Sequence, residues 1–305
     1  MRRVVPLVLA GALTLAACGG DDDAAAPTTT TTPTPTTTTT AEPTTTTPTT
    51  TTTTTAEAGT VDAPQAASTP QGLVSQITEA EAAIRDPSTE PDDVAAAGHI
   101  LQIAYKKLAL TPDWREEVLA GLPPERRSAA EANSTAQAQL RALVGHPRDT
   151  LPDWQIVSPA PAEELLGYYK AAEAEFGVPW PYLAAIHLTE TRMGRIRGVS
   201  EAGAQGPMQF MPATWDAYGE GDINSNQDSI RAAARYLVRN GAPGDMANAL
   251  WNYNHSDRYV EAVTLYAEQM RADEAAFTGY YHFQVYYWHV SGDLWLPVGW
   301  TRERT

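Results

Sequence analysis

The sequence predicts a mainly helical protein with two helical blocks and a short β-hairpin near its C-terminal end. From about residue 71, apolar residues recur at three- and four-residue spacing, and prolines and glycines stand where helices would begin and end. A stretch rich in aromatic and β-branched residues follows Phe277 and is typical of a strand. With 305 residues, the chain is long enough for two modest domains.

The chain is acidic, with 21 Lys and Arg residues against 37 Asp and Glu residues and a net charge of −16. This balance argues against nucleic acid as a partner, because such binding depends on cations that neutralise phosphates. It also argues against attachment to anionic lipids through a polybasic segment. Cys18 is the one cysteine of the sequence, so no intramolecular disulfide can form.

Residues 1–17 are predicted to be an export signal. Arg2 and Arg3 precede an apolar stretch that is shorter than the ~20 residues of a spanning helix. Residues 15–18 (LAAC) resemble the lipobox of bacterial lipoproteins, in which the cysteine is acylated and becomes the mature N-terminus. The alternative is a plain secretory signal that contains a cysteine by chance. Because two or more acyl chains anchor a protein stably, the resemblance implies a membrane anchor on Cys18.

Residues 18–70 are predicted to combine this lipidated cysteine with a disordered tether of threonine, proline and alanine. Such a composition lacks the apolar side chains that offset chain entropy. At ~3.1 Å per residue in an extended form, the tether could reach on the order of 140 Å above a membrane.

The first helical block is predicted over residues 71–150. The spacing of five apolar residues places them on one helix face: Val94, Ala97, Leu101, Ala104 and Leu108. Thr111 and Pro112 are predicted to begin a further helix, and another runs from Pro124 to residue 143 and ends near Gly145. No catalytic group of residues is recognisable here, so we expect a small domain for spacing, docking or contact with partners.

The second block, over residues 157–275, contains a candidate catalytic acid. A helix over 163–176 is predicted to end at Gly177, and the next helix begins at Pro181. Helical spacing places Glu190 on the same face as Leu183 and Ile186. A carboxyl group against apolar surface has a raised pKa, as the general acid of a glycosidase requires. The alternative is a structural ion pair with Arg192, Arg195 or Arg197, and spacing alone leaves both open.

Three motifs in order resemble lytic murein transglycosylases with a lysozyme-like catalytic domain. Residues 190–195 (ETRMGR) are similar to the segment around the catalytic acid of the membrane-bound B-type enzymes. Residues 200–212 (SEAGAQGPMQFMP) resemble the signature of the soluble-transglycosylase domain, and residues 253–255 (YNH) resemble its Tyr-Asn motif. The resemblance covers roughly residues 160–275. The long insertion of the B-type enzymes between Glu190 and Ser200 is absent, so this spacing follows the shorter soluble type.

The resemblance implies that the enzyme cleaves the MurNAc–GlcNAc β-1,4 bond of peptidoglycan and forms 1,6-anhydroMurNAc. Glu190 would be the catalytic acid and then the base. The residues implied to contact the substrate are Ser200, Met208, Gln209, Tyr253 and Asn254. The implied partners are glycan strands, the membrane through Cys18, and possible other cell-wall enzymes, at the outer face of the membrane in the cell envelope. No cofactor and no metal are implied.

Glu201 and Asp257 are carboxylates near the candidate acid and its motifs in the sequence, and residues 222–228 form a polar segment. A lysozyme-type hydrolase would need a second catalytic carboxylate, and we expect both candidates, Glu201 and Asp257, to be surface residues. Residues 222–228 alternate oxygen ligands like a calcium loop, but they lack the glycine and glutamate that an EF-hand requires. We expect Asp228 to cap the helix over 229–239 instead.

Residues 276–305 are predicted to form a C-terminal β-hairpin extension. One strand is expected over 280–290, a turn over 291–293 and a return strand over 294–298. Because a short hairpin is not stable alone, it should pack on the catalytic domain.

The sequence contains no Ser-x-x-Lys pair and no His-Glu-x-x-His motif, so penicillin-binding and zinc-peptidase chemistry are excluded. The complete prediction is a lysozyme-like catalytic domain, preceded by a small helical domain and followed by a short β-hairpin. Two other functions stay open: a hydrolytic muramidase, and a non-catalytic lipoprotein that binds peptidoglycan.

Overall fold

The computed structural model describes residues 63–302 and is mainly helical, as the sequence predicts. Its helices are α1 (Pro70–Arg85), α2 (Pro91–Leu110), α3 (Arg115–Gly121), α4 (Pro124–Val144), α5 (Ala162–Phe176), α6 (Trp180–Thr191), α7 (Pro212–Tyr218), α8 (Asn226–Arg239), α9 (Met246–Tyr253), α10 (Asp257–Ala272) and α11 (Ala275–Tyr281). The strands are β1 (Gln155–Ile156), β2 (Ile196–Arg197), β3 (Val285–His289) and β4 (Gly292–Leu296). The predicted export signal, Cys18 and residues 18–62 of the predicted tether lie outside the described residues.

Prolines and glycines set several helix boundaries where the sequence predicts them. A proline stands in the first turn of α2, α4 and α6, where its missing N–H costs no helical hydrogen bond. Gly145 follows α4 at φ 82° and Gly177 follows α5 at φ 73°, a left-handed backbone that glycine adopts without steric cost. The predicted helix start at Pro112 is instead a short 3-10 turn (Pro112–Trp114) that leads into α3.

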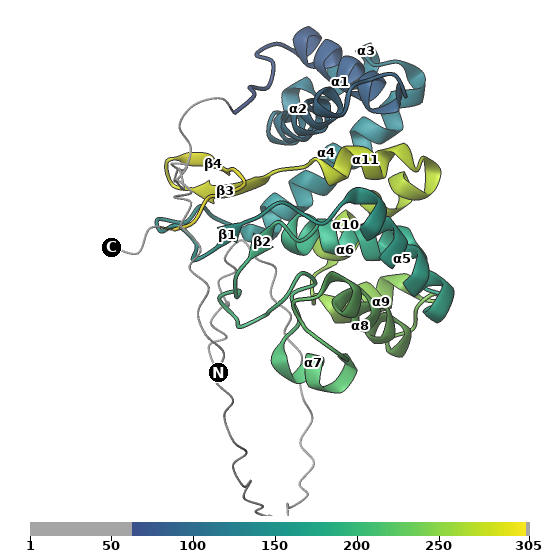
Figure 1. Ribbon diagram of the computed structural model, residues 1–305. Helices are drawn as coiled ribbons and strands as arrows, with labels where there is room; N and C mark the ends of the chain where they lie inside the picture. The colour runs from purple at the N-terminus through teal and green to yellow at the C-terminus, as the bar shows by residue number, and fades with distance from the viewer. Residues whose placement is uncertain (1–62, 303–305) are drawn as a thin grey trace, which may run out of the picture.

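The N-terminal core is formed by α1, α2, α3 and the beginning of α4, which make the upper group of helices in Figure 1. Buried Leu73, Leu101 and Ala130 belong to this core. It also encloses one carboxylate, Glu81, which accepts hydrogen bonds from the Tyr105 hydroxyl and from Arg85. The charge is therefore compensated inside the core.

The central core contains α5 to α11 and the second half of α4. Every residue from Pro181 to Thr191 in α6 is buried, so this helix is enclosed by its neighbours on all sides. The helix α4 joins the two cores, because Ala130 lies in the first and Ala136 in the second. It packs along α10 and also against α2.

The predicted strand over 280–290 begins later than expected, at Val285, and the prediction for residues 280–284 was wrong. Tyr280 and Tyr281 end α11 instead. The buried Tyr280 donates a hydrogen bond of 2.6 Å to Asn133 of α4, and its ring packs on Tyr266. Tertiary contacts thus override the strand preference of aromatic residues. The return strand also starts earlier than expected, at Gly292.

The hairpin of β3 and β4 packs on two parts of the molecule (Figure 1). Its Val285 and Leu296 form a small third core with residues near β1 and β2, including Ile156 and Ile196. On the other side it contacts α2, where the Tyr286 hydroxyl lies 2.8 Å from His99. The hairpin therefore connects the N-terminal helices to the segment that follows α6.

The predicted helix cap at Asp228 was wrong. The cap of α8 is Ser225, whose hydroxyl accepts a hydrogen bond from the Asp228 backbone N–H. The carboxylate of Asp228 accepts instead from the backbone N–H of Asp222. Across residues 63–302, no helix combines the length and apolar character that crossing a bilayer requires.

Candidate active site

The end of α6 presents the candidate acid on an unusual stretch of backbone. Glu190 lies in the last turn, and Arg192 and Met193 follow in left-handed conformations with φ of 55° and 60°. Gln209 has φ 52°, and these are all the non-glycine residues of the described chain with positive φ. Such conformations cost about 1–3 kcal/mol each and concentrate at functional sites. Arg192 and Met193 lie in the motif of residues 190–195, and Gln209 lies in the motif of residues 200–212.

The carboxyl group of Glu190 is buried and has one hydrogen-bond partner within residues 63–302. Only 2% of the residue is exposed, and Oε1 accepts a hydrogen bond of 2.8 Å from the Tyr259 hydroxyl. Oε2 is buried and has no partner among the described residues. Burial raises the pKa of Glu190 to about 8, although the Tyr259 hydrogen bond and the charge of Arg192 act in the opposite direction. The carboxyl group is therefore mostly protonated at neutral pH.

The alternative of a structural ion pair is not supported. In the described part of the chain, no cationic side chain lies within 4.0 Å of the Glu190 carboxylate. The three candidate guanidinium groups donate to backbone carbonyls instead: Arg192 to Leu188, Arg195 to Tyr281 and Arg197 to Asn224. Glu190 is thus a buried acid without a neutralising contact.

The segment after α6 turns back through two tight loops that carry Ser200 and Gln209. The Ser200 hydroxyl accepts a 2.8 Å hydrogen bond from the Ala204 N–H, and the Gln209 amide donates to the Gly206 carbonyl at 2.9 Å. Gly206 has φ 74°, and a Cβ atom there would lie 2.1 Å from the Ile223 carbonyl oxygen. This position therefore requires glycine.

Two side chains form hydrogen bonds that connect the second of these loops to helices α6 and α9. The Thr191 hydroxyl donates to the Pro207 carbonyl at 2.6 Å, and the Tyr253 hydroxyl donates to the Met208 carbonyl at 2.7 Å. The side chain of Met208 is fully buried. The Tyr253 hydroxyl is therefore engaged by the backbone of Met208 rather than by the acid.

The hydroxyl that reaches the acid belongs to Tyr259, which is outside the three predicted motifs. Its ring stacks parallel to that of Tyr253, with centroids 6.4 Å apart. A signal was present in the sequence, because Tyr259 and Tyr266 are seven residues apart on the apolar face of α10. A buried tyrosine hydroxyl needs a polar partner, and Glu190 provides it.

Asn254 and Trp251 lie close to Tyr253 in the chain. Asn254 is 4% exposed, and its amide nitrogen has no hydrogen-bond partner among the described residues. Trp251, one turn earlier, is 42% exposed, and its ring centroid lies 4.4 Å from that of His255. The aromatic residues Trp180, Trp215 and Tyr218 instead pack edge to face on neighbouring aromatic rings.

The carboxylates that a hydrolase would need lie at the surface. Asp257 is exposed, and Glu201 is exposed and forms a 3.8 Å ion pair with Arg148. In the described residues, the buried carboxylates are Glu81 and Glu190, and Glu81 belongs to the N-terminal core. The site therefore has a single buried carboxyl group.

The loop over 222–228 is organised by its own hydrogen bonds. The Asp222 carboxylate accepts from the Asn224 backbone and side chain, and Asp228 accepts from Asp222. Within residues 63–302, no three His, Cys, Asp or Glu side chains are grouped so that they could hold a metal ion.

Glu190 is thus a buried acid at the end of the enclosed helix α6, and the loops that carry Ser200 and Gln209 follow it in sequence. Residues 167–274 match the family model of the Transglycosylase SLT domain, which has a lysozyme-like fold. This range contains Glu190, its partner Tyr259 and the predicted substrate-contact residues Ser200, Met208, Gln209, Tyr253 and Asn254. The match supports a lytic transglycosylase that acts on peptidoglycan of the cell wall. No curated protein and no solved structure matches the chain.

Proposed function

We propose that this protein is a lytic transglycosylase that cleaves the MurNAc–GlcNAc β-1,4 bond and forms 1,6-anhydroMurNAc. The main support is that Glu190 is a buried acid, 2% exposed, whose one hydrogen-bond donor in the described part of the chain is a tyrosine hydroxyl. The absence of a second buried carboxylate around it in residues 63–302 favours a mechanism in which one group acts twice.

In this mechanism the neutral Glu190 donates its proton to the glycosidic oxygen as the bond from that oxygen to the anomeric carbon breaks. Oε2 has no other partner among the described residues and is free to carry this proton. The carboxylate that results then takes the proton of the muramoyl 6-hydroxyl, whose oxygen bonds to the anomeric carbon. The raised pKa supplies the neutral acid, and no water enters the product.

The other predicted site residues would bind the sugar chain. Ser200 and Gln209 would contact N-acetyl and hydroxyl groups, and Met208 with Tyr253 would form the wall behind them. The unpartnered amide of Asn254 suits a polar group of the substrate. The exposed Trp251 suits stacking on a sugar face.

We also propose that Cys18 is lipidated and holds the enzyme at the outer face of the membrane, with the tether reaching into the cell wall. We further propose that residues 190–195 correspond to the segment around the catalytic acid of the membrane-bound B-type enzymes. Export of a soluble protein with an unmodified Cys18, and no change on Cys18→Ala, would contradict the anchor.

Product analysis tests the chemistry. Wild-type enzyme acting on purified peptidoglycan should release muropeptides that end in 1,6-anhydroMurNAc, lighter by one water than hydrolytic products. Mass spectrometry of the digest separates the two species. Reducing-end products alone would identify the protein as a lysozyme-type muramidase. Binding to peptidoglycan without any cleavage would identify it as a non-catalytic lipoprotein that binds peptidoglycan.

The Tyr259 hydroxyl should set the pH range of activity. Because its hydrogen bond lowers the pKa of Glu190, Tyr259→Phe should raise that pKa further and move the alkaline loss of activity to higher pH. The plateau rate should fall about tenfold, since the carboxyl group loses its orienting contact. A pH–rate profile measures both effects. Tyr168→Phe, which removes an exposed hydroxyl bonded to Glu164, is the matched control and should leave the profile unchanged.

A further inference from the structure

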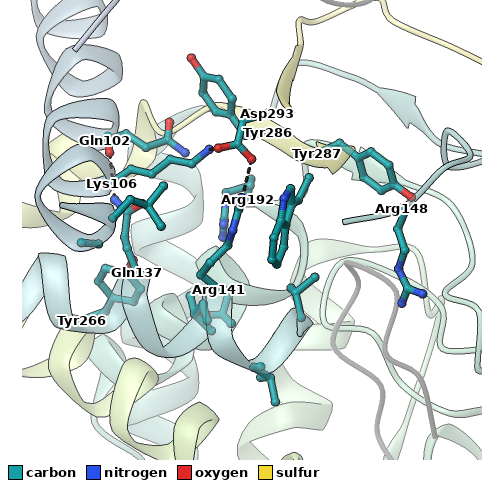
Figure 2. A pocket seen from close by; sticks show the side chains of 17 residues that line it. Gln102, Lys106, Gln137, Arg141, Arg148, Arg192, Tyr266, Tyr286, Tyr287 and Asp293 are labelled. Atoms are coloured by element: carbon teal, nitrogen blue, oxygen red, sulfur yellow. Dashed lines mark hydrogen bonds and ion pairs between the residues drawn. The ribbon is translucent and has the colours of Figure 1, made fainter. Parts of the chain in front are cut away.

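A pocket adjoins the end of α6 on the side that faces the N-terminal helices and the hairpin. It lies between α2, α4, the end of α6, α10 and the hairpin of β3 and β4. Figure 2 shows the side chains that line it. Two lining residues, Thr189 and Arg192, are the residue before Glu190 and the second residue after it in the sequence. The pocket is therefore close to the reacting centre but does not include Glu190 itself.

The pocket is cationic, although the chain as a whole has a charge of −16. Its lining contains the cations Lys106, Arg141, Arg148 and Arg192. The one acidic residue of the lining, Asp293, is already shared, since its carboxylate lies 2.8 Å from Lys106 and 2.5 Å from Arg141 (Figure 2). The lining therefore keeps an excess of positive charge, which is a recognition feature for an anion.

Among residues 63–302, some donors in the pocket have no hydrogen-bond acceptor. Arg148 has a side chain that is only 12% exposed. Its Nε has no hydrogen-bond partner among the described residues, and its Nη2 has only the 3.8 Å ion pair with Glu201. The Thr189 hydroxyl, on a residue that is 6% exposed, is likewise without a partner there. A buried donor without an acceptor costs about 1–3 kcal/mol, so these groups are better satisfied by a bound ligand.

The lining also includes apolar side chains. Leu140, Leu143 and Val144 lie on the last turns of α4, the same turns that carry Arg141. The pocket thus combines cationic groups with apolar groups that suit methyl groups of a ligand. The peptide stem of peptidoglycan has this chemistry, because it combines alanine methyl groups with free carboxylates and is attached to the muramoyl sugar at the cleavage site.

We propose that the pocket binds a carboxylate of the peptide stem and thereby positions the glycan strand against Glu190. This proposal rests on the proposed function, because it assigns a further part of the same substrate. Arg148 connects the two sites, since its ion pair with Glu201 places it beside Ser200. Arg148 is a specificity residue rather than a catalytic one.

Calorimetric binding to the full chain carrying Glu190→Gln tests the proposal without cleavage. The probes are uncross-linked glycan strands with stems, the same strands after amidase removal of the stems, and a synthetic stem peptide as free acid or C-terminal amide. We expect strands with stems to bind about tenfold more tightly than bare strands, the effect of one charge-assisted hydrogen bond. Arg148→Gln should abolish the difference, and Arg148→Lys should restore part of it.

Arg239→Gln is the matched control, because it removes the same charge from an exposed position on α8 and should leave the preference intact. Equal affinity for both strands, or for the acid and the amide peptide, would overturn the proposal. Inorganic phosphate that binds with the same dependence on Arg148, when the peptide does not bind, would assign the pocket to a phosphate instead. Wild-type enzyme that cuts neither strand would contradict the proposed function, whereas the binding measurements report on the pocket independently.

Discussion

Glu190→Gln is expected to reduce the rate of glycan cleavage by at least 10²–10⁴-fold, the range that general acid–base catalysis contributes. Glutamine keeps the size of the side chain and can still accept the Tyr259 hydrogen bond, but it cannot donate and retake a proton. Both halves of the proposed reaction therefore fail together. The measurement is release of soluble muropeptides from purified peptidoglycan at neutral pH.

The controls for this variant are Glu201→Gln and Asp257→Asn, which change exposed carboxylates. Each should retain most of the wild-type rate if one carboxyl group does both proton transfers. A two-carboxylate hydrolase would instead lose most of its activity at one of these positions. Full activity of Glu190→Gln would reject the whole site.

The same substitution should make the protein more stable at alkaline pH. The folded pKa of Glu190, about 8, lies above the 4.5 of an exposed glutamate, so the folded state binds its proton more tightly than the unfolded state. The stabilisation by this proton is complete below about pH 4.5 and is lost as the pH rises through about 8. Wild-type protein then carries a buried charge that glutamine avoids, at a cost on the order of a few kcal/mol.

Thermal unfolding at a series of pH values measures this effect. At pH 9 the melting temperature of Glu190→Gln should exceed that of the wild type by several degrees, and at pH 4 the two should agree. Glu201→Gln is again the control and should follow the wild type at every pH. Identical melting curves of Glu190→Gln and wild type at pH 9 would mean that the carboxyl group is not desolvated in the folded protein.

The sequence was sufficient for features that depend on neighbours in the chain. Helical spacing predicted that Glu190 is buried beside Leu183 and Ile186, and Gly145 and Gly177 marked the ends of α4 and α5. The match over residues 167–274 agrees with the domain that the three motifs predicted. These features could be predicted because a helical period or a left-handed backbone conformation depends on only a few consecutive residues.

Features that depend on distant segments were not predictable in this way. The partner of Glu190, Tyr259, comes from a helix 69 residues further along the chain. Residues 280–281 are helical because α4 and α10 offer Tyr280 its contacts. The cationic pocket unites Lys106, Arg148 and Asp293, which no local pattern relates to one another.

The position of α4 determines how the two helical cores unfold. Ala130 and Ala136 are less than two turns apart on this helix, yet they belong to different cores. Loss of α4 would expose apolar surface in both at once, so neither core can melt while the other stays intact. Residues 63–302 should therefore behave as one cooperative unit, with a single thermal transition. Protonation of one buried carboxyl group in the central core then changes the melting temperature of the N-terminal helices as well.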